Sequence, residues 1–191
     1  MSNLEAVERH LRTFFKGHKA TIDTWPNQKK DRPHIDVLVF EPGPRTELWT
    51  YASLGGSSAM RPGRAKEFFV LAPKPDPAHV ELVTMTASYH ADPDPSYGLS
   101  YGHTVPIGEP VVPGSPCTHL LVSLPYLFGE ELEVCDLDEF HVQILWLLPI
   151  TPEELEYKKK HGLDALEERF EATELDYADL RRHSVVDRWT Q

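Results

Sequence analysis

The chain has 191 residues and a net charge of −11, and 40% of its residues are apolar and 26% charged. This size and composition fit one globular domain with a real core and exclude general disorder. The N-terminal residues lack the apolar stretch of a signal peptide, and the apolar run at 144–150 is too short to cross a bilayer. We therefore expect a soluble, cytoplasmic protein without a membrane segment.

Charge is distributed unevenly along the sequence. Residues 1–75 carry 12 basic and 8 acidic side chains, whereas residues 76–157 carry 14 acidic side chains and no Lys or Arg. Phosphate binding needs Lys and Arg, so nucleic acid is excluded as a ligand. The acidic block favours a basic protein partner instead, because opposite charge would steer the two together. An acidic surface that only keeps the protein soluble is the alternative.

The first half of the chain predicts two helices and three strands. Ser2 and Glu5 have the spacing of a capping box and predict the start of a helix, and Gly17 predicts its end. Its apolar residues recur at three- and four-residue intervals and so share one face: Leu4, Val7, Leu11 and Phe14. Strands are predicted at 34–40, 48–54 and 68–72, and a second helix at 77–90 that buries Val80, Val83 and Ala87.

The second half begins with a loop that is rich in Pro and Gly, at 91–117. An ordered loop of this length often binds a ligand. Strands are predicted at 118–124 and 140–150, and the second turns apolar on both faces from Leu145 onward, as a central strand does. Thr151 and Glu154 predict a helix that ends near Gly162, and a further helix follows at 163–171. The polar tail from 173 onward has apolar residues that could dock: Leu175, Leu180, Val185, Val186 and Trp189.

These elements follow one another without a regular βαβ rhythm. The sequence therefore predicts an α+β fold, in which a mixed β-sheet is sandwiched with helices. Four aromatic residues are assigned to core or sheet packing: Trp49, Tyr51, Tyr126 and Trp146.

Motifs for catalysis are incomplete. Ser100 lies in a G-x-S-x-G pattern, but the strand before it and the helix after it that form a nucleophile elbow are missing. His90 and His103 flank one loop and could converge, yet no H-E-x-x-H or C-x-x-C spacing is present. Cys117 and Cys135 predict idle thiols rather than a disulfide framework. We expect no enzyme activity, no metal and no cofactor, with a small hydrolase or metalloenzyme as the less favoured alternative.

Carboxylates are dense between the last two predicted strands. Such a run is usually a solvated turn, and the functional alternative is a surface that recognises cations of a partner. The candidate partner-binding residues are Glu130, Glu131, Glu133, Asp136 and Asp138.

Several segments together resemble the suppressor of fused family. Residues 34–40, followed by a proline turn, look like its opening strand, and residues 102–106 resemble one of its loop motifs. Residues 143–155 carry a strand–Pro-Ile-Thr-x-Glu-Glu–helix pattern that is similar to the signature at the end of the family, with a matching segment at 162–166. The resemblance covers about residues 30–186. It implies a single suppressor-of-fused-like domain over residues 1–191, with a core at about 30–172 and a tail at 173–191.

The resemblance also implies a binding module with no known enzymatic activity. Animal members clamp a peptide strand of a transcription factor between two lobes, and this chain looks like the first lobe alone. Bacterial members are often predicted immunity proteins encoded beside toxins. The resemblance therefore implies a bacterial immunity protein that neutralises a toxin partner, and the acidic block suits a basic toxin. A regulatory adaptor that captures a peptide strand, at a sheet edge or in the loop at 91–117, is the alternative.

Overall fold

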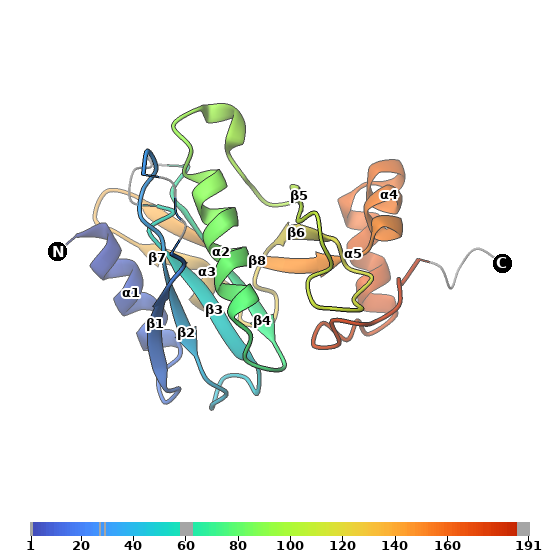
Figure 1. The fold of residues 1–191 in the computed structure, drawn as a ribbon, viewed down its shortest axis with the longest axis horizontal. Helices are drawn as coiled ribbons and strands as arrows, with labels where there is room; N and C mark the ends of the chain where they lie inside the picture. The colour runs from blue at the N-terminus through green and yellow to red at the C-terminus, as the bar shows by residue number, and fades with distance from the viewer. Residues whose placement is uncertain (1, 27, 29, 58–62, 187–191) are drawn as a thin grey trace. The chain divides into compact units, whose positions relative to one another are not determined.

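A computed structural model of the chain describes residues 2–26, 28, 30–57 and 63–186 (Figure 1). The chain divides into two compact units. Unit 1 comprises Met1–Tyr101 and Ser123–Leu147, and unit 2 comprises Gly102–Val122 and Leu148–Gln191. That residues 1–191 form a single domain stays a prediction. Among the described residues, none of the helices has both the length and the apolar character that crossing a membrane requires.

Unit 1 contains a mixed sheet. Strands β1 to β4 pair antiparallel in chain order, β4 pairs parallel with β8, and β7 pairs antiparallel with β8. Its strands are β1 Ala20–Thr24, β2 Asp36–Phe40, β3 Trp49–Leu54, β4 Lys66–Ala72, β7 Val134–Asp136 and β8 His141–Ile150, whose end belongs to unit 2. Its helices are α1 Asn3–Phe14, α2 Pro77–His90, the short 3-10 helix η1 Pro95–Tyr97 and α3 Glu130–Glu133.

Unit 2 contains an antiparallel strand pair and two helices. Strands β5 (Thr104–Pro106) and β6 (His119–Ser123) form the pair, and α4 (Pro152–His161) and α5 (Leu163–Ala172) precede the tail. Within unit 1 the strand order is β1-β2-β3-β4-β8, with β7 also beside β8. The predicted α+β class with a mixed sheet is therefore confirmed.

The core of unit 1 lies where α2 packs on the sheet. Helix α2, drawn in green in Figure 1, contacts β2, β3 and β4, and it buries Val80, Val83 and Ala87 as the sequence predicted. Strands β3 and β4 are almost completely buried on both faces. The pairing of apolar strands with an apolar helix face supplies most of the driving force for folding of this unit.

The predicted elements agree with the structure to within a few residues at their ends. Both capping boxes are present, at Ser2–Glu5 before α1 and at Thr151–Glu154 before α4. Four elements of the structure have no counterpart among those predicted from the sequence: β1, β5, β7 and α3. Strand β1 has no buried face to give it a period-two pattern, β5 lies in the segment assigned to a long loop, and the carboxylate run assigned to a solvated turn forms α3 and β7.

A buried carboxylate fixes the turn between β3 and β4. The Glu67 side chain is fully buried and accepts five hydrogen bonds. The donors are the hydroxyls of Ser53 (2.5 Å) and Ser57 (2.7 Å) and the backbone N–H groups of residues 55–57 (3.0 to 3.1 Å). Burial raises the pKa of Glu67, and these hydrogen bonds oppose the rise. Gly55 has φ +129, and a Cβ there would lie 2.3 Å from a backbone oxygen, so the turn requires glycine at this position.

A buried histidine connects the end of α2 to two loops of unit 1. The backbone N–H of Leu99 donates to Nδ1 of His90 at 2.8 Å, so Nε2 carries the proton and donates to the Arg64 carbonyl at 3.0 Å. The His90 side chain is therefore held as a neutral imidazole. Burial lowers its pKa from 6.5 to about 4.

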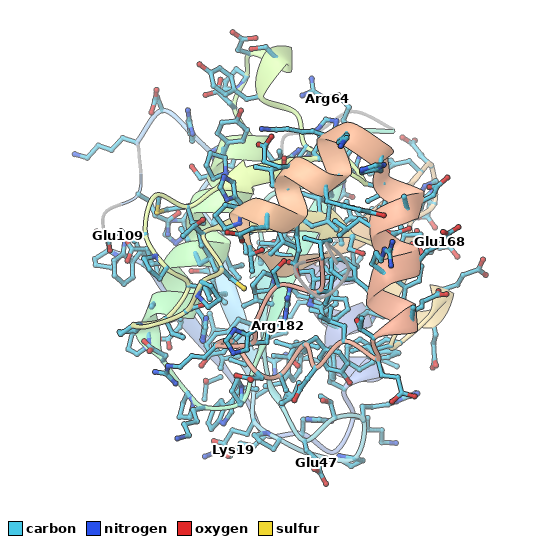
Figure 2. The ribbon with its side chains drawn as sticks, turned by 90° about the vertical axis from the view of Figure 1, so that its right-hand side faces the viewer. Lys19, Glu47, Arg64, Glu109, Glu168 and Arg182 are labelled. Carbon is cyan, nitrogen blue, oxygen red and sulfur yellow. The ribbon has the colours of Figure 1, made fainter. Side chains whose placement is uncertain are left out.

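Within unit 2, a buried ion pair attaches the C-terminal tail to the start of α4. Arg182 donates to both carboxylate oxygens of Glu154, at 2.5 and 2.9 Å, and to the Pro149 carbonyl at 3.0 Å. Glu154 also accepts from the backbone N–H groups of Thr151 (2.9 Å) and Val185 (3.0 Å). Figure 2 shows Arg182 among closely packed side chains. In the tail Leu180 and Val185 are buried, Leu175 and Val186 are half-buried, and Trp189 lies outside the described residues.

Replacement of Arg182 by methionine should destabilise the protein strongly. The Glu154 carboxylate would remain buried without its cation, and removal of one partner of a buried pair costs about 3–5 kcal/mol. The free energy of unfolding in urea measures this loss. The matched control is Arg181→Met, because Arg181 is exposed and donates one hydrogen bond to the Pro113 carbonyl. The control should lose at most about 1 kcal/mol, and an equal loss in the two variants would contradict the role of the pair.

The stability of the protein should fall in acid because of His90. The unfolded chain takes up a proton near pH 6.5, whereas the folded chain resists protonation down to about pH 4. The contribution is therefore complete above pH 6.5 and is lost between pH 6.5 and 4, by roughly 3 kcal/mol. Urea unfolding of the wild type and of His90→Gln across this range measures it. The difference in the free energy of unfolding between the two proteins should become smaller toward pH 4. A difference that stays constant with pH would contradict a lowered pKa of His90 in the folded chain.

Candidate partner-binding surface

The five carboxylates predicted to bind a partner lie in one short segment of unit 1, which we call the acidic surface (Glu130, Glu131, Glu133, Asp136 and Asp138). The three glutamates belong to α3, Asp136 ends β7, and Asp138 lies in the turn between β7 and β8. Local structure explains this arrangement. The backbone N–H groups of Phe128 and Gly129 both donate to the Pro125 carbonyl at 2.8 Å and form the turn from which α3 begins.

One apolar residue holds α3 in place. Leu132 is completely buried, and α3 packs against α1. His10 of α1 hydrogen-bonds to the Leu132 carbonyl through Nε2 at 3.0 Å. Since a four-residue helix has too few internal hydrogen bonds to be stable alone, these contacts determine its position. They bury one side of α3 and leave Glu130 and Glu131 exposed.

The five carboxylates differ in whether they already have a partner within the chain. Glu131 forms an ion pair with Arg45 (3.0 Å), whose guanidinium lies over the Phe14 ring, and Glu133 accepts a hydrogen bond from Gln143 (2.8 Å). The other three are exposed, and within the described part of the chain they have no ion-pair partner: Glu130, Asp136 and Asp138. Those three are the carboxylates that a partner cation can approach without competition.

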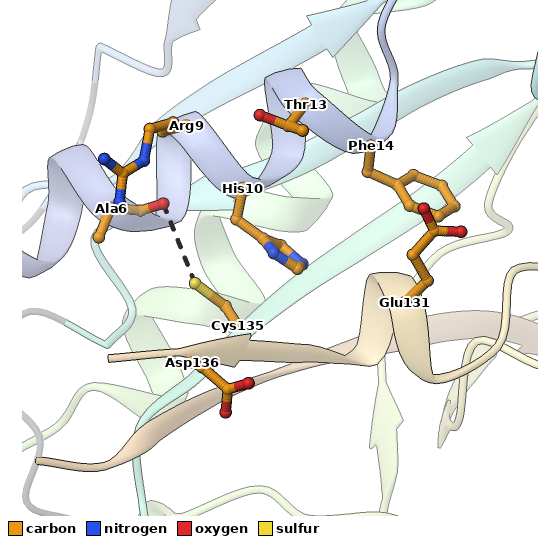
Figure 3. A pocket seen from close by; sticks show the side chains of 8 residues that line it. All are labelled: Ala6, Arg9, His10, Thr13, Phe14, Glu131, Cys135 and Asp136. Carbon is orange, nitrogen blue, oxygen red and sulfur yellow. Dashed lines mark hydrogen bonds between the residues drawn. The ribbon is translucent and has the colours of Figure 1, made fainter. Parts of the chain in front are cut away.

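A shallow depression of about 270 Å³ lies between α1 and the acidic surface. The residues that line it include Arg9 and His10 of α1 and Glu131, Cys135 and Asp136 of the facing segment. Figure 3 shows His10 pointing toward Cys135, whereas the Asp136 carboxylate points away from α1. The Cys135 thiol lies 3.9 Å from the Ala6 carbonyl oxygen, and burial raises its pKa to about 11. The thiol is therefore protonated at neutral pH and is not a nucleophile. The depression offers mixed charge for recognition rather than a reactive group.

Exposed apolar side chains border the acidic surface. Tyr126 and Leu127 lie in the turn before α3 and are 57% and 44% exposed. The Tyr126 hydroxyl lies 2.9 Å from that of Tyr101, which is 37% exposed. The assignment of Tyr126 to core packing is therefore wrong, because the Pro125 turn points this residue outward; Tyr51 and Trp146 are buried as expected, and Trp49 is half-buried. Aromatic side chains beside charged groups are typical of protein–protein interfaces.

Candidate catalytic residues are not assembled into a reactive centre. Ser100 is exposed in an irregular segment before a turn, and it is not delivered by a strand into a helix. Both ring nitrogens of His90 are engaged by backbone groups, which leaves neither for a metal. Among the residues that the structure describes, no group of three or more His, Cys, Asp or Glu side chains is placed to hold a metal ion.

The residues that support and border the acidic surface were not predicted from the sequence. His10 and Arg45 lie far from it along the chain and reach it only through the fold. Tyr126 and Leu127 had a weak signal, because they follow a proline and precede a glycine and so fit a turn.

Comparison with known proteins gives three kinds of match. The model of the family "Suppressor of fused protein (SUFU)" matches residues 31–183. The immunity protein YqcF of Bacillus subtilis is 37% identical over 68 residues, which are 36% of this chain and 35% of that protein. The match thus spans about a third of the length of this curated relative.

Solved structures share the fold over nearly the whole chain. A SUFU homologue of Neisseria gonorrhoeae is 34% identical with a TM-score of 0.82, and the match covers 95% of this chain and 96% of that one. The Sufu–Fu complex (16% identity, TM-score 0.74, 98% and 94% covered) and Drosophila Suppressor of Fused (17%, 0.74, 97% and 52%) are similar in fold. The family model and the Neisseria homologue together show that this chain belongs to the suppressor of fused protein (SUFU) family.

Proposed function

We propose that this chain is a bacterial immunity protein, which neutralises a toxin by binding it and catalyses no reaction. The likeness to an immunity protein of Bacillus subtilis supports this role, although it covers about a third of that protein. The Sufu–Fu complex, formed by a protein of the same fold, supports a protein as the partner. The proposal places the chain in the cytoplasm, where its two buried cysteines stay as thiols.

The acidic surface is the observation that carries the proposal. Residues 76–157 contain no Lys or Arg, so no cation within this stretch neutralises the carboxylates. Glu130, Asp136 and Asp138 are exposed and lack ion-pair partners in the described residues, which makes them the primary contacts we propose. Glu131 and Glu133, which have partners of their own, are secondary contacts. A basic toxin surface would be attracted by this charge and would associate faster at low salt.

The exposed side chains of Tyr126 and Leu127 complete the proposed interface. Charged pairs at the rim of an interface mainly set the association rate, whereas buried aromatic anchors contribute most of the affinity. Both residues lie within a few positions of α3, so one partner surface can cover them together with the glutamates.

The role as an immunity protein predicts protection from a toxin encoded beside it. The product of the gene next to the one for this chain should arrest growth when it is expressed alone in a heterologous bacterial host. Co-expression of the chain should restore growth, because the toxin surface is then covered. Colony counts with and without the chain measure the effect. A neighbouring product that is harmless, or that still kills in the presence of the chain, would count against the role.

Charge reversal predicts where that toxin binds. Asp136→Lys together with Asp138→Lys should slow association at least about tenfold at low salt and flatten its salt dependence, because the attraction becomes repulsion. Biolayer interferometry against a catalytically inactive form of the toxin measures the rate. The control is Glu168→Lys with Glu171→Lys, an equal charge change at two exposed positions of α5. If both double variants bind alike, the partner contacts some other surface, and the role itself can still be judged from growth protection.

A further inference from the structure

Strand β1 leaves one edge of the unit 1 sheet open. It has a single neighbour among the described strands, β2, to which all five of its residues pair. Residues 21–24 are exposed, and Ile22 at the centre of the strand is 49% exposed, whereas the four residues 37–40 of β2 are buried. In Figure 1, β1 is the dark blue strand beside β2.

The pairing with β2 fixes which backbone groups of β1 point outward. The backbone N–H of Glu41, which follows β2, donates to the Lys19 carbonyl at 2.9 Å. The backbone N–H and C=O of Lys19 therefore point toward the β2 side. Antiparallel ladders alternate, and the backbone groups of Thr21 and Asp23 therefore face β2 as well. The N–H and C=O groups of the intervening residues point to the open edge: Ala20, Ile22 and Thr24.

Proteins usually protect such an edge. Common devices are a proline, a charged side chain (above all lysine), a bulge or a very short strand. Strand β5 of unit 2 has two of them, since it is three residues long and ends at Pro106. Strand β1 contains no proline or lysine, and its register with β2 is continuous over five residues without a bulge. Its edge is therefore a template for a further strand.

We propose that a second copy of this chain occupies this edge, with the two β1 strands pairing antiparallel about a two-fold axis at Ile22. The three residues with outward backbone groups then meet one another in hydrogen-bonded pairs. Ile22 pairs with the partner's Ile22, and Ala20 pairs with the partner's Thr24 on each side. Six backbone hydrogen bonds result, and the two sheets join into one.

The side chains of β1 are complementary to themselves in this register. Ile22 packs on the partner's Ile22, which covers an apolar side chain that is half exposed in the single chain. Thr21 lies opposite the partner's Asp23 in a non-hydrogen-bonded pair, where side chains approach most closely, and a hydroxyl can donate to a carboxylate there. The strand carries one charge, Asp23, and the two-fold axis does not place it against its own copy. A second copy therefore fits this edge without opposing like charges.

The test is the oligomeric state of the full chain and of variants at position 21. Sedimentation velocity from low micromolar to about millimolar protein should show a reversible dimer of twice 21.7 kDa. Thr21→Lys places a cation opposite the partner's Asp23 twice and should tighten the dimer by roughly two- to thirtyfold, and Thr21→Asp should weaken it by a similar factor. Position 21 is exposed, so neither change disturbs the core.

A backbone variant tests the hydrogen bonds themselves. Ile22→Pro removes an N–H that points outward, so the β1–β2 ladder stays intact while the pairing of two copies loses two of its hydrogen bonds. This variant should be monomeric, whereas Ile22→Val, which keeps the N–H and an apolar side chain, should still dimerise. Circular dichroism verifies the fold of each variant. A chain that is monomeric at every concentration, or a dimer that responds to neither substitution at position 21, overturns the proposal and leaves the edge to an extended segment of another protein.

Discussion

The acidic surface depends on the burial of one leucine. A run of carboxylates would by itself remain extended and solvated, because like charges repel and none of the side chains gains from burial. Leu132 changes this balance, since it is completely buried among five carboxylates that remain partly or fully exposed. The hydrogen bond between His10 and the Leu132 carbonyl also fixes the orientation of α3 against α1, because hydrogen bonds are directional and apolar contacts are not. The carboxylates are therefore presented on a fixed frame, which lowers the entropy that a partner must remove on binding.

Three buried polar groups elsewhere in the described part of the chain hold irregular segments. Glu67 gathers the N–H groups of a glycine turn, His90 joins two loops to the end of α2, and Glu154 with Arg182 attaches the tail. Each side chain satisfies backbone groups that no helix or strand could satisfy, and an unsatisfied backbone group costs free energy when buried. These three polar groups of the core thus fix loops, whereas apolar packing fixes the helices and strands.

The parts of the fold that could be predicted are those whose signals are local. Helix caps such as Thr151–Glu154 and the alternation in β8 depend on neighbours a few residues away, and they were located to within one or two residues. Strand β1 could not be found in this way, because its residues show no alternation of apolar and polar side chains. Only its pairing with β2 makes it a strand. The acidic residues of the site were visible as a cluster, but Arg45 and His10 reach them from more than 80 residues away in sequence. No local pattern encodes such contacts.

The pair between Glu131 and Arg45 bears on how the acidic surface would meet a partner. Both side chains are largely solvent-exposed, and exposed pairs of this kind contribute at most about 1 kcal/mol. A cation brought by the partner can therefore replace Arg45 at little cost. The released guanidinium would remain beside the surface over the Phe14 ring, where it could meet a carboxylate or carbonyl of the partner. A partner must then supply a cation for Glu131 and an acceptor for Arg45, at the distance that separates these two side chains. Recognition would therefore depend on how charges are arranged on the partner, and not only on its net positive charge.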